Sequence, residues 1–138
     1  MCLILDTNKY GDFLASENQD MEPVRNWMKT RNGKIAYSPT EKMERELNRH
    51  NKMREQFDRY RETDKLKLVP PNEVEQAMNS LPDLRSDDPD IIALAQVSEV
   101  KLLVSGDENL HADFKTIVKG KIYQTRAHRR LLRSDLCP

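Results

Sequence analysis

The sequence predicts an α/β fold in which a central, mostly parallel β-sheet is flanked by helices on both faces. Two observations predict it. Short apolar runs, typical of buried strands, alternate with segments that carry helical periodicity and helix-start signals. Alternating strands and helices favour a parallel sheet, because each crossover helix packs back onto the sheet. The length of 138 residues fits one domain over residues 1–138.

The first elements follow from local composition. The run Leu3–Asp6 is apolar up to its terminal acid and predicts a buried strand. Helices are expected over Lys9–Leu14 and from Glu22, where Pro23 suits the first turn, with Asn32–Gly33 as the stop. The stretch Lys34–Tyr37 then predicts the second strand.

A single long helix is predicted next, from Pro39 as far as Glu62. Ser38 is suited to cap this helix, and Glu41 completes a capping box. With about 3.6 residues per turn, one stripe of the helix carries the following residues: Glu46, His50, Met53, Phe57 and Tyr60.

Glu46 is therefore expected to face the interior, whereas Glu44, roughly 200° away around the helix, is expected to face water. A carboxylate on an apolar face is costly unless it is paired or binds a metal. Glu46 is thus either a metal ligand or the partner of a neighbouring Lys or Arg. His50, one turn further on, is interpreted as a half-buried core histidine.

The second half of the chain continues the alternation of strands and helices. Further strands are expected at Leu66–Val69, Lys101–Ser105 and Lys121–Tyr123. Further helices are expected to begin at the capping box Asn72–Glu75, at Asp88, at Asp107 and at Arg126, the last one running to Arg133.

Charge is distributed unevenly, although the net charge is +0. The segment from Phe114 to Ser134 contains no Asp or Glu. Its cations are Lys115, Lys119, Lys121, Arg126, Arg129, Arg130 and Arg133. A basic flank beside an acidic site favours a phosphate-backbone substrate, with Arg126, Arg129, Arg130 and Arg133 as candidate nucleic-acid contacts. A solvated helix face that contacts a partner protein is the alternative.

Several classes of protein are disfavoured. The N-terminus carries no signal-peptide pattern, and no apolar run approaches the ~18 residues needed to span a bilayer. No membrane association is expected, and the predicted location is cytoplasmic. Cys2 and Cys137 are accordingly expected to be free thiols, and their spacing does not match a zinc site.

Four acids lie where a strand or loop leads into a helix, or on a helix face: Asp6, Glu46, Asp88 and Asp107. Carboxylates at strand ends of an α/β sheet converge on one crevice. Oxygen ligands without His or Cys suit Mg²⁺ or Mn²⁺, which points to metal-assisted hydrolysis of a phosphodiester. Ser105 and Asn109 are candidates to orient an acid or a water molecule from the second shell.

Each acid also has a simpler interpretation. Asp6 could be a turn aspartate, and Asp88 could be a plain helix cap. Asp87 and Asp90 lie close enough in the sequence to be confused with Asp88.

Taken together, these segments resemble the PIN domain, a small metal-dependent ribonuclease domain found in VapC-type toxins. The resemblance spans essentially the whole chain. It is carried by Leu3–Asn8, Glu46–Leu47, the Ile- and Ala-rich run Asp88–Ala95, and Leu102–Asp107. In the last of these, Ser105 stands where the family often has Thr. The resemblance implies a PIN-like α/β/α sandwich whose four acids line a pocket for one or two divalent ions.

The resemblance also implies the function. The expected activity is endoribonuclease cleavage of RNA that depends on Mg²⁺ or Mn²⁺, with Asp6, Glu46, Asp88 and Asp107 as catalytic metal ligands. An antitoxin protein and a homodimer partner are expected candidates for such a short PIN-like chain. A non-catalytic RNA-binding or scaffolding module on the same fold is the alternative. A receiver-like phosphotransfer domain is disfavoured, because Asp6 has no acidic neighbour after the first strand.

Overall fold

A parallel sheet forms the centre of the protein. The computed structural model describes residues 1–135 and 137. Its five strands are all parallel and lie in the order β3-β2-β1-β4-β5. Their bounds are β1 Cys2–Leu5, β2 Lys34–Tyr37, β3 Leu66–Leu68, β4 Leu102–Val104 and β5 Lys121–Tyr123. The predicted α/β class and every predicted strand are confirmed, with ends that shift by a residue or two.

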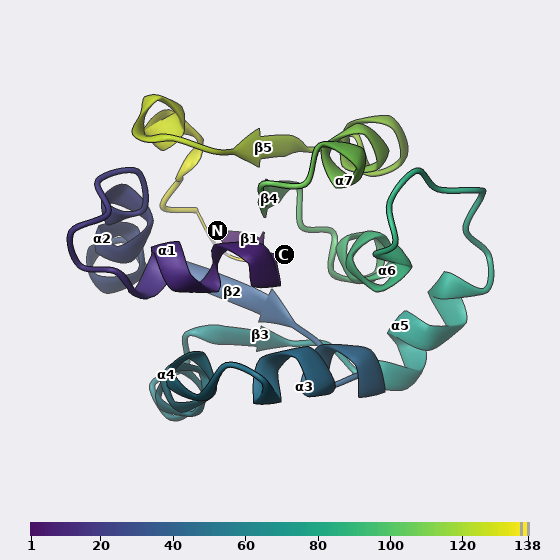
Figure 1. Ribbon diagram of the computed structural model, residues 1–138, viewed down its shortest axis with the longest axis horizontal. Coiled ribbons are helices and arrows are strands. Elements are labelled where there is room, and N and C mark those ends of the chain that lie inside the picture. The colour runs from purple at the N-terminus through teal and green to yellow at the C-terminus, as the bar shows by residue number, and fades with distance from the viewer. Residues whose placement is uncertain (136, 138) are drawn as a thin grey trace.

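Helices cover both faces of this sheet (Figure 1), with α1 and α2 on one side and α6 and α7 on the other. The α-helices are α1 Tyr10–Leu14, α2 Glu22–Thr30, α3 Glu41–Asn48, α4 Asn51–Glu62, α5 Pro71–Met78, α6 Pro89–Ser98 and α7 Glu108–Asp113. Shorter turns complete the list: η1 Thr7–Lys9, the π-helical η2 Phe114–Val118 and the 3₁₀ turn η3 Arg126–Leu131.

The strand order creates a switch point between β1 and β4. The chain moves from β1 outward to β2 and β3, and then returns to the other side of β1 to add β4 and β5. Right-handed crossovers in opposite directions place their helices on opposite faces of the sheet. The crevice at the carboxyl ends of β1 and β4 is therefore where a ligand of such a sheet binds.

The predicted long helix is interrupted, which is a correction. Helix α3 ends at Asn48, and α4 begins at Asn51. Between them His50 leaves helical geometry, at φ −121° and ψ 85°, and its Nδ1 accepts a hydrogen bond from Met53 N at 3.3 Å. His50 is therefore a helix cap, and the continuous stripe predicted from Glu46 onward does not exist.

Two capping predictions are also wrong. Thr40 caps α3 by accepting a hydrogen bond from Met43 N at 3.2 Å, whereas Ser38 is fully buried with no hydrogen-bond partner for its Oγ. Helix α5 begins one residue before Asn72, at Pro71, and has no side-chain cap. Pro71 occupies the first position of α5, where its missing N–H costs nothing, and Pro39 lies one residue before the cap of α3.

Glu44 is not a solvent-facing residue. Its carboxylate accepts a hydrogen bond from Tyr37 Oη at 2.7 Å and forms an ion pair with Arg54 at 2.9 Å. Because Arg54 lies in the first turn of α4, the side of α3 that carries Glu44 faces the start of a second helix, and periodicity within α3 alone does not reveal that neighbour.

The two ends of the chain are joined at the amino end of β1. Trp27 Nε1 donates to the carbonyl of Arg133 at 2.7 Å, and Cys2 pairs with Cys137 in a disulfide with a Cα–Cα distance of 5.0 Å. The expectation of two free thiols is therefore wrong, because tertiary structure brings together cysteines 135 positions apart. Cysteine usage then no longer supports a reducing compartment. No helix within residues 1–135 and 137 is long and apolar enough to cross a membrane.

Candidate metal and phosphodiester site

Asp6 and Asp107 lie at the switch point of the sheet. Asp6 directly follows β1, and its backbone N–H donates to Val104 O of β4 at 2.9 Å. Its side chain is almost fully buried, with an exposed fraction of 5%. Asp107 follows β4 after a two-residue loop. The two carboxylates interact electrostatically, as expected for acids at the ends of adjacent strands.

Ser105 connects these two acids. Its Oγ donates to Asp6 Oδ2 at 2.6 Å and accepts from Asp107 N at 3.1 Å. One carboxylate oxygen of Asp107 then accepts from the backbone N–H groups of Asn109 and Leu110 at 2.9 and 3.2 Å. The predicted orienting residues thus contribute differently: Ser105 through its side chain, and Asn109 through its backbone amide, with an exposed side chain.

Two residues that sequence reasoning did not select stabilise the same loops. Asn8 Oδ1 accepts from Gly106 N at 3.1 Å and so joins the turn after β1 to the loop after β4. The buried His111 places its Nε2 2.6 Å from Ser105 O. Asn8 could have been found from its position two residues after the strand-terminal Asp6, because a short amide side chain readily bonds nearby backbone.

Asp88 and Glu46 approach the site from α6 and α3. Asp88 immediately precedes α6, but its side chain makes no capping hydrogen bond. Instead its Oδ1 lies 3.2 Å from the ammonium group of Lys42, and Glu46 Oε1 lies 3.9 Å from the same Nζ. Asp88 is therefore not a plain helix cap, and Glu46 has the Lys partner that was the alternative to a metal. Both carboxylates also interact with Asp6.

Asp90 joins this group, although the sequence indicates Asp88 and not Asp90 as the site residue. Its side chain is 2% exposed, and its Oδ1 lies 3.2 Å from Lys42 Nζ. The signal that could have identified Asp90 lies in α6 itself, where the residues from Asp90 to Ala95 are all buried. A carboxylate inside such a helix requires a cation, because an unpaired buried charge is strongly unfavourable.

Burial and mutual repulsion shift the pKa values of three of these acids, Asp6, Glu46 and Asp88. Burial raises the pKa of Asp6, the hydrogen bond from Ser105 opposes it, and the charges of Asp88 and Asp107 raise it further. Burial also raises the pKa of Glu46 and of Asp88, and in both cases Lys42 opposes the rise. Crowded carboxylates of this kind are stabilised in their charged form by a cation.

The chemical type of the available ligands suits a divalent cation. The available ligands are carboxylate oxygens, which suit Mg²⁺ or Mn²⁺. Within residues 1–135 and 137, however, no three His, Cys, Asp or Glu side chains already form a metal-binding group. The Lys42 ammonium lies between the acids of α3 and α6 instead.

A small cavity adjoins this acidic cluster. It has a volume of about 320 Å³ and is lined by Thr7, Tyr10, Glu46, Arg49 and His50. The rings of Tyr10 and His50 meet edge to face, with centroids 5.9 Å apart. The nearby Asp6 and Glu46 raise the pKa of the buried Tyr10 further than burial alone. The cavity thus combines one exposed guanidinium with the edge of the acidic cluster.

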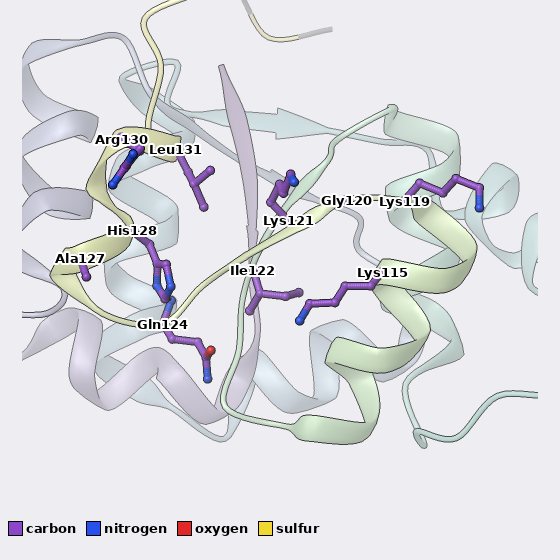
Figure 2. A pocket seen from close by; sticks show the side chains of 10 residues that line it. All are labelled: Lys115, Lys119, Gly120, Lys121, Ile122, Gln124, Ala127, His128, Arg130 and Leu131. Carbon is purple, nitrogen blue, oxygen red and sulfur yellow. The ribbon is translucent and has the colours of Figure 1, made fainter.

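The four predicted nucleic-acid contacts are all exposed, three of them on η3 and Arg133 shortly after it. Arg126 donates its backbone N–H to Asp20 Oδ1 at 3.1 Å, and Arg133 forms an ion pair with Asp135 at 3.1 Å. Arg129 is exposed on η3. Arg130 lines a separate basic groove beside β5 (Figure 2).

Comparison with known proteins adds no relative. No family model, no curated protein and no solved structure matches this chain.

Proposed function

We propose that this protein is a metal-dependent endoribonuclease that hydrolyses phosphodiester bonds, with a PIN-like site. The observation that carries the proposal is the placement of Asp6 and Asp107 at the carboxyl ends of β1 and β4, where Ser105 bridges them, with Asp88 and Glu46 both beside Lys42. Burial raises the pKa values of Asp6, Glu46 and Asp88, and carboxylates with raised pKa values in a crevice are typical of a functional site.

In this proposal Asp6, Asp88 and Asp107 hold Mg²⁺ or Mn²⁺, and Glu46 completes the ligand set. A bound divalent ion supplies an activated water and neutralises charge on the scissile phosphate. The chain's own contribution is orientation, because Ser105 holds the Asp6 carboxylate and the Asp107 backbone in one geometry.

RNA as the substrate rests on the resemblance to the PIN domain, since the acids specify only phosphodiester chemistry. An antitoxin partner and a homodimer are proposed on the same basis. The cavity beside Glu46 supports a nucleotide next to the scissile bond, because Arg49 places a guanidinium there and Arg recognises phosphate well.

The test is cleavage of a mixed RNA pool by purified protein, with Mn²⁺ and with EDTA. Asp6→Asn removes one ligand charge, and Asp83→Asn is the matched control at an exposed aspartate. We expect metal-dependent cleavage by the wild type and by Asp83→Asn, and none by Asp6→Asn. Full activity in Asp6→Asn would disprove the site.

A non-catalytic RNA-binding or scaffolding role is the second candidate. The observation that favours it is Lys42, which already forms ion pairs with Asp88 and Asp90 without a metal. Under this alternative the purified protein binds RNA without cleaving it, and Mn²⁺ does not raise its melting temperature.

A further inference from the structure

A second site lies beside the edge strand β5. The cavity there has a volume of about 690 Å³ and is bounded by η2, β5 and η3. Figure 2 shows that its side chains come from three elements: Lys115 and Lys119 from η2 and its end, Lys121 and Ile122 from β5, and Arg130 and Leu131 from η3. We call this site the β5 groove. It shares no lining residue with the acidic cluster or with the cavity beside Glu46.

The β5 groove is strongly basic. Its cations are three lysines and Arg130, and the chain has no acid between Phe114 and Ser134. The acids that flank this segment are engaged elsewhere. Asp113 accepts hydrogen bonds from the backbone N–H groups of Arg85 and Ser86, and Asp135 pairs with Arg133. A ligand of the groove must therefore carry negative charge.

The groove also offers an open strand edge. Within the described residues, β5 pairs with β4 and ends the sheet. Lys121 N donates to Lys101 O at 2.8 Å, so the main chain of Lys121 faces the sheet. Because N–H and C=O directions alternate along a strand, the main chain of Ile122 points outward. Its side chain is buried to 8% exposure and, with Leu131, gives the groove an apolar floor.

We propose that the β5 groove binds an extended acidic peptide segment of a partner protein, which adds a parallel or antiparallel strand to β5. The peptide main chain pairs with Ile122, an apolar side chain packs on Ile122 and Leu131, and flanking carboxylates meet the lysines and Arg130. Strand addition of this kind takes affinity from main-chain hydrogen bonds and specificity from alternate side chains.

The groove is less suited to single-stranded RNA. Such binding relies on aromatic platforms on which bases stack. The ring in the lining is His128, and its Nδ1 already accepts from the backbone N–H groups of Gln124 and Thr125 at 3.1 and 3.2 Å. Its ring also packs edge to face against Tyr123. The apolar floor and open edge instead match a peptide.

The test is fluorescence anisotropy with a labelled peptide of about eight residues in which Glu and Val alternate, a length typical of a strand. Lys121→Glu/Arg130→Glu reverses two groove charges, and Lys52→Glu/Arg61→Glu reverses two exposed charges on α4 as the matched control. A second peptide of the same sequence carries N-methyl groups at alternate residues and cannot form one set of main-chain hydrogen bonds.

We expect saturable binding to the wild type and to the α4 control. Binding should weaken about tenfold or more in the groove variant and with the N-methylated peptide. Absence of saturable binding, or equal binding by the groove variant, would overturn the proposal. Displacement of the peptide by polyuridine RNA, with RNA binding lost in the groove variant, would assign the groove to RNA. The ribonuclease assay with Asp6→Asn is independent of this result, because it concerns other residues.

Discussion

Replacement of Lys42 by Met tests whether this ammonium holds the acidic cluster together. Lys42 Nζ lies 3.2 Å from both Asp88 Oδ1 and Asp90 Oδ1, and donates to Asp87 O at 2.7 Å. Burial lowers the pKa of Lys42, but Asp90 and Asp88 outweigh it, so the pKa is raised and the group stays charged. Met retains much of the aliphatic stem and removes the charge.

The expected loss of stability without metal is about 2 kcal/mol. A charge-assisted hydrogen bond contributes about 1.5–3 kcal/mol and an exposed ion pair about 0–1 kcal/mol. The Lys42 side chain is 31% exposed, whereas that of Asp90 is 2% exposed. The expected loss therefore lies in the lower part of the range for a charge-assisted hydrogen bond and above that for an exposed ion pair. For a chain of this size, about 2 kcal/mol lowers the melting temperature by roughly 6 °C.

The affinity for Mn²⁺ should increase in Lys42→Met, although the stability without metal decreases. Without Lys42, Mn²⁺ no longer competes with an ammonium for Asp88, and we expect about tenfold tighter binding, equivalent to about 1.4 kcal/mol. The assay is thermal unfolding in EDTA and across a Mn²⁺ titration, with the exposed Lys52→Met on α4 as control. The reasoning is refuted if Lys42→Met melts like the wild type in EDTA, or if its Mn²⁺ affinity is no higher.

Three further results are expected. Ser105→Ala removes the hydrogen bond to Asp6 Oδ2, while Thr7 N still donates to Oδ1, and should lower the free energy of unfolding by about 1–3 kcal/mol, measured by urea denaturation, with a smaller effect for the isosteric Ser105→Cys. The raised pKa of Asp6 means that this carboxyl group binds a proton more tightly in the folded protein than in the unfolded chain. Its stabilising contribution is therefore present at low pH and is lost as the pH rises through its folded pKa. Melting temperatures measured in EDTA should depend less on pH for Asp6→Asn than for the wild type, and an equal dependence would contradict this. Finally, the Cys2–Cys137 disulfide closes a loop of almost the whole chain, so Cys137→Ser should destabilise the non-reduced protein by about 4 kcal/mol. With dithiothreitol present, the variant and the wild type should have the same melting temperature. Equal melting temperatures without reductant would show that the bond does not form.

The strands and their terminal acids could be predicted because their signals are local. An apolar run such as Leu3–Leu5 is buried wherever the sheet places it, and an acid at its end emerges at the carboxyl edge. The same holds for Asp107 after β4. The alternation of strands and helices then favours a parallel sheet, which the structure confirms.

The helix break and the capping residues were not predictable in the same way. Periodicity continues across Arg49 and His50, so nothing in the spacing marks the turn between α3 and α4. The break lets α4 contact α1 and β3 and bury Met53 and Phe57, and most helical stability comes from packing of this kind. Thr40 was overlooked because Ser38 followed by Pro39 satisfies the local rule equally well.

The sequence by itself determined the fold class, the strand positions and the presence of carboxylates at the ends of β1 and β4, because each depends on residues near one another in the chain. The tertiary structure alone decided which charges meet. Lys42 reaches Asp88 and Asp90 across 46 and 48 positions, and Cys2 reaches Cys137 across 135. Such pairs depend on the strand order β3-β2-β1-β4-β5 and on which face each crossover helix covers. Periodicity records which side of an element is apolar, but it carries no information about which element lies opposite.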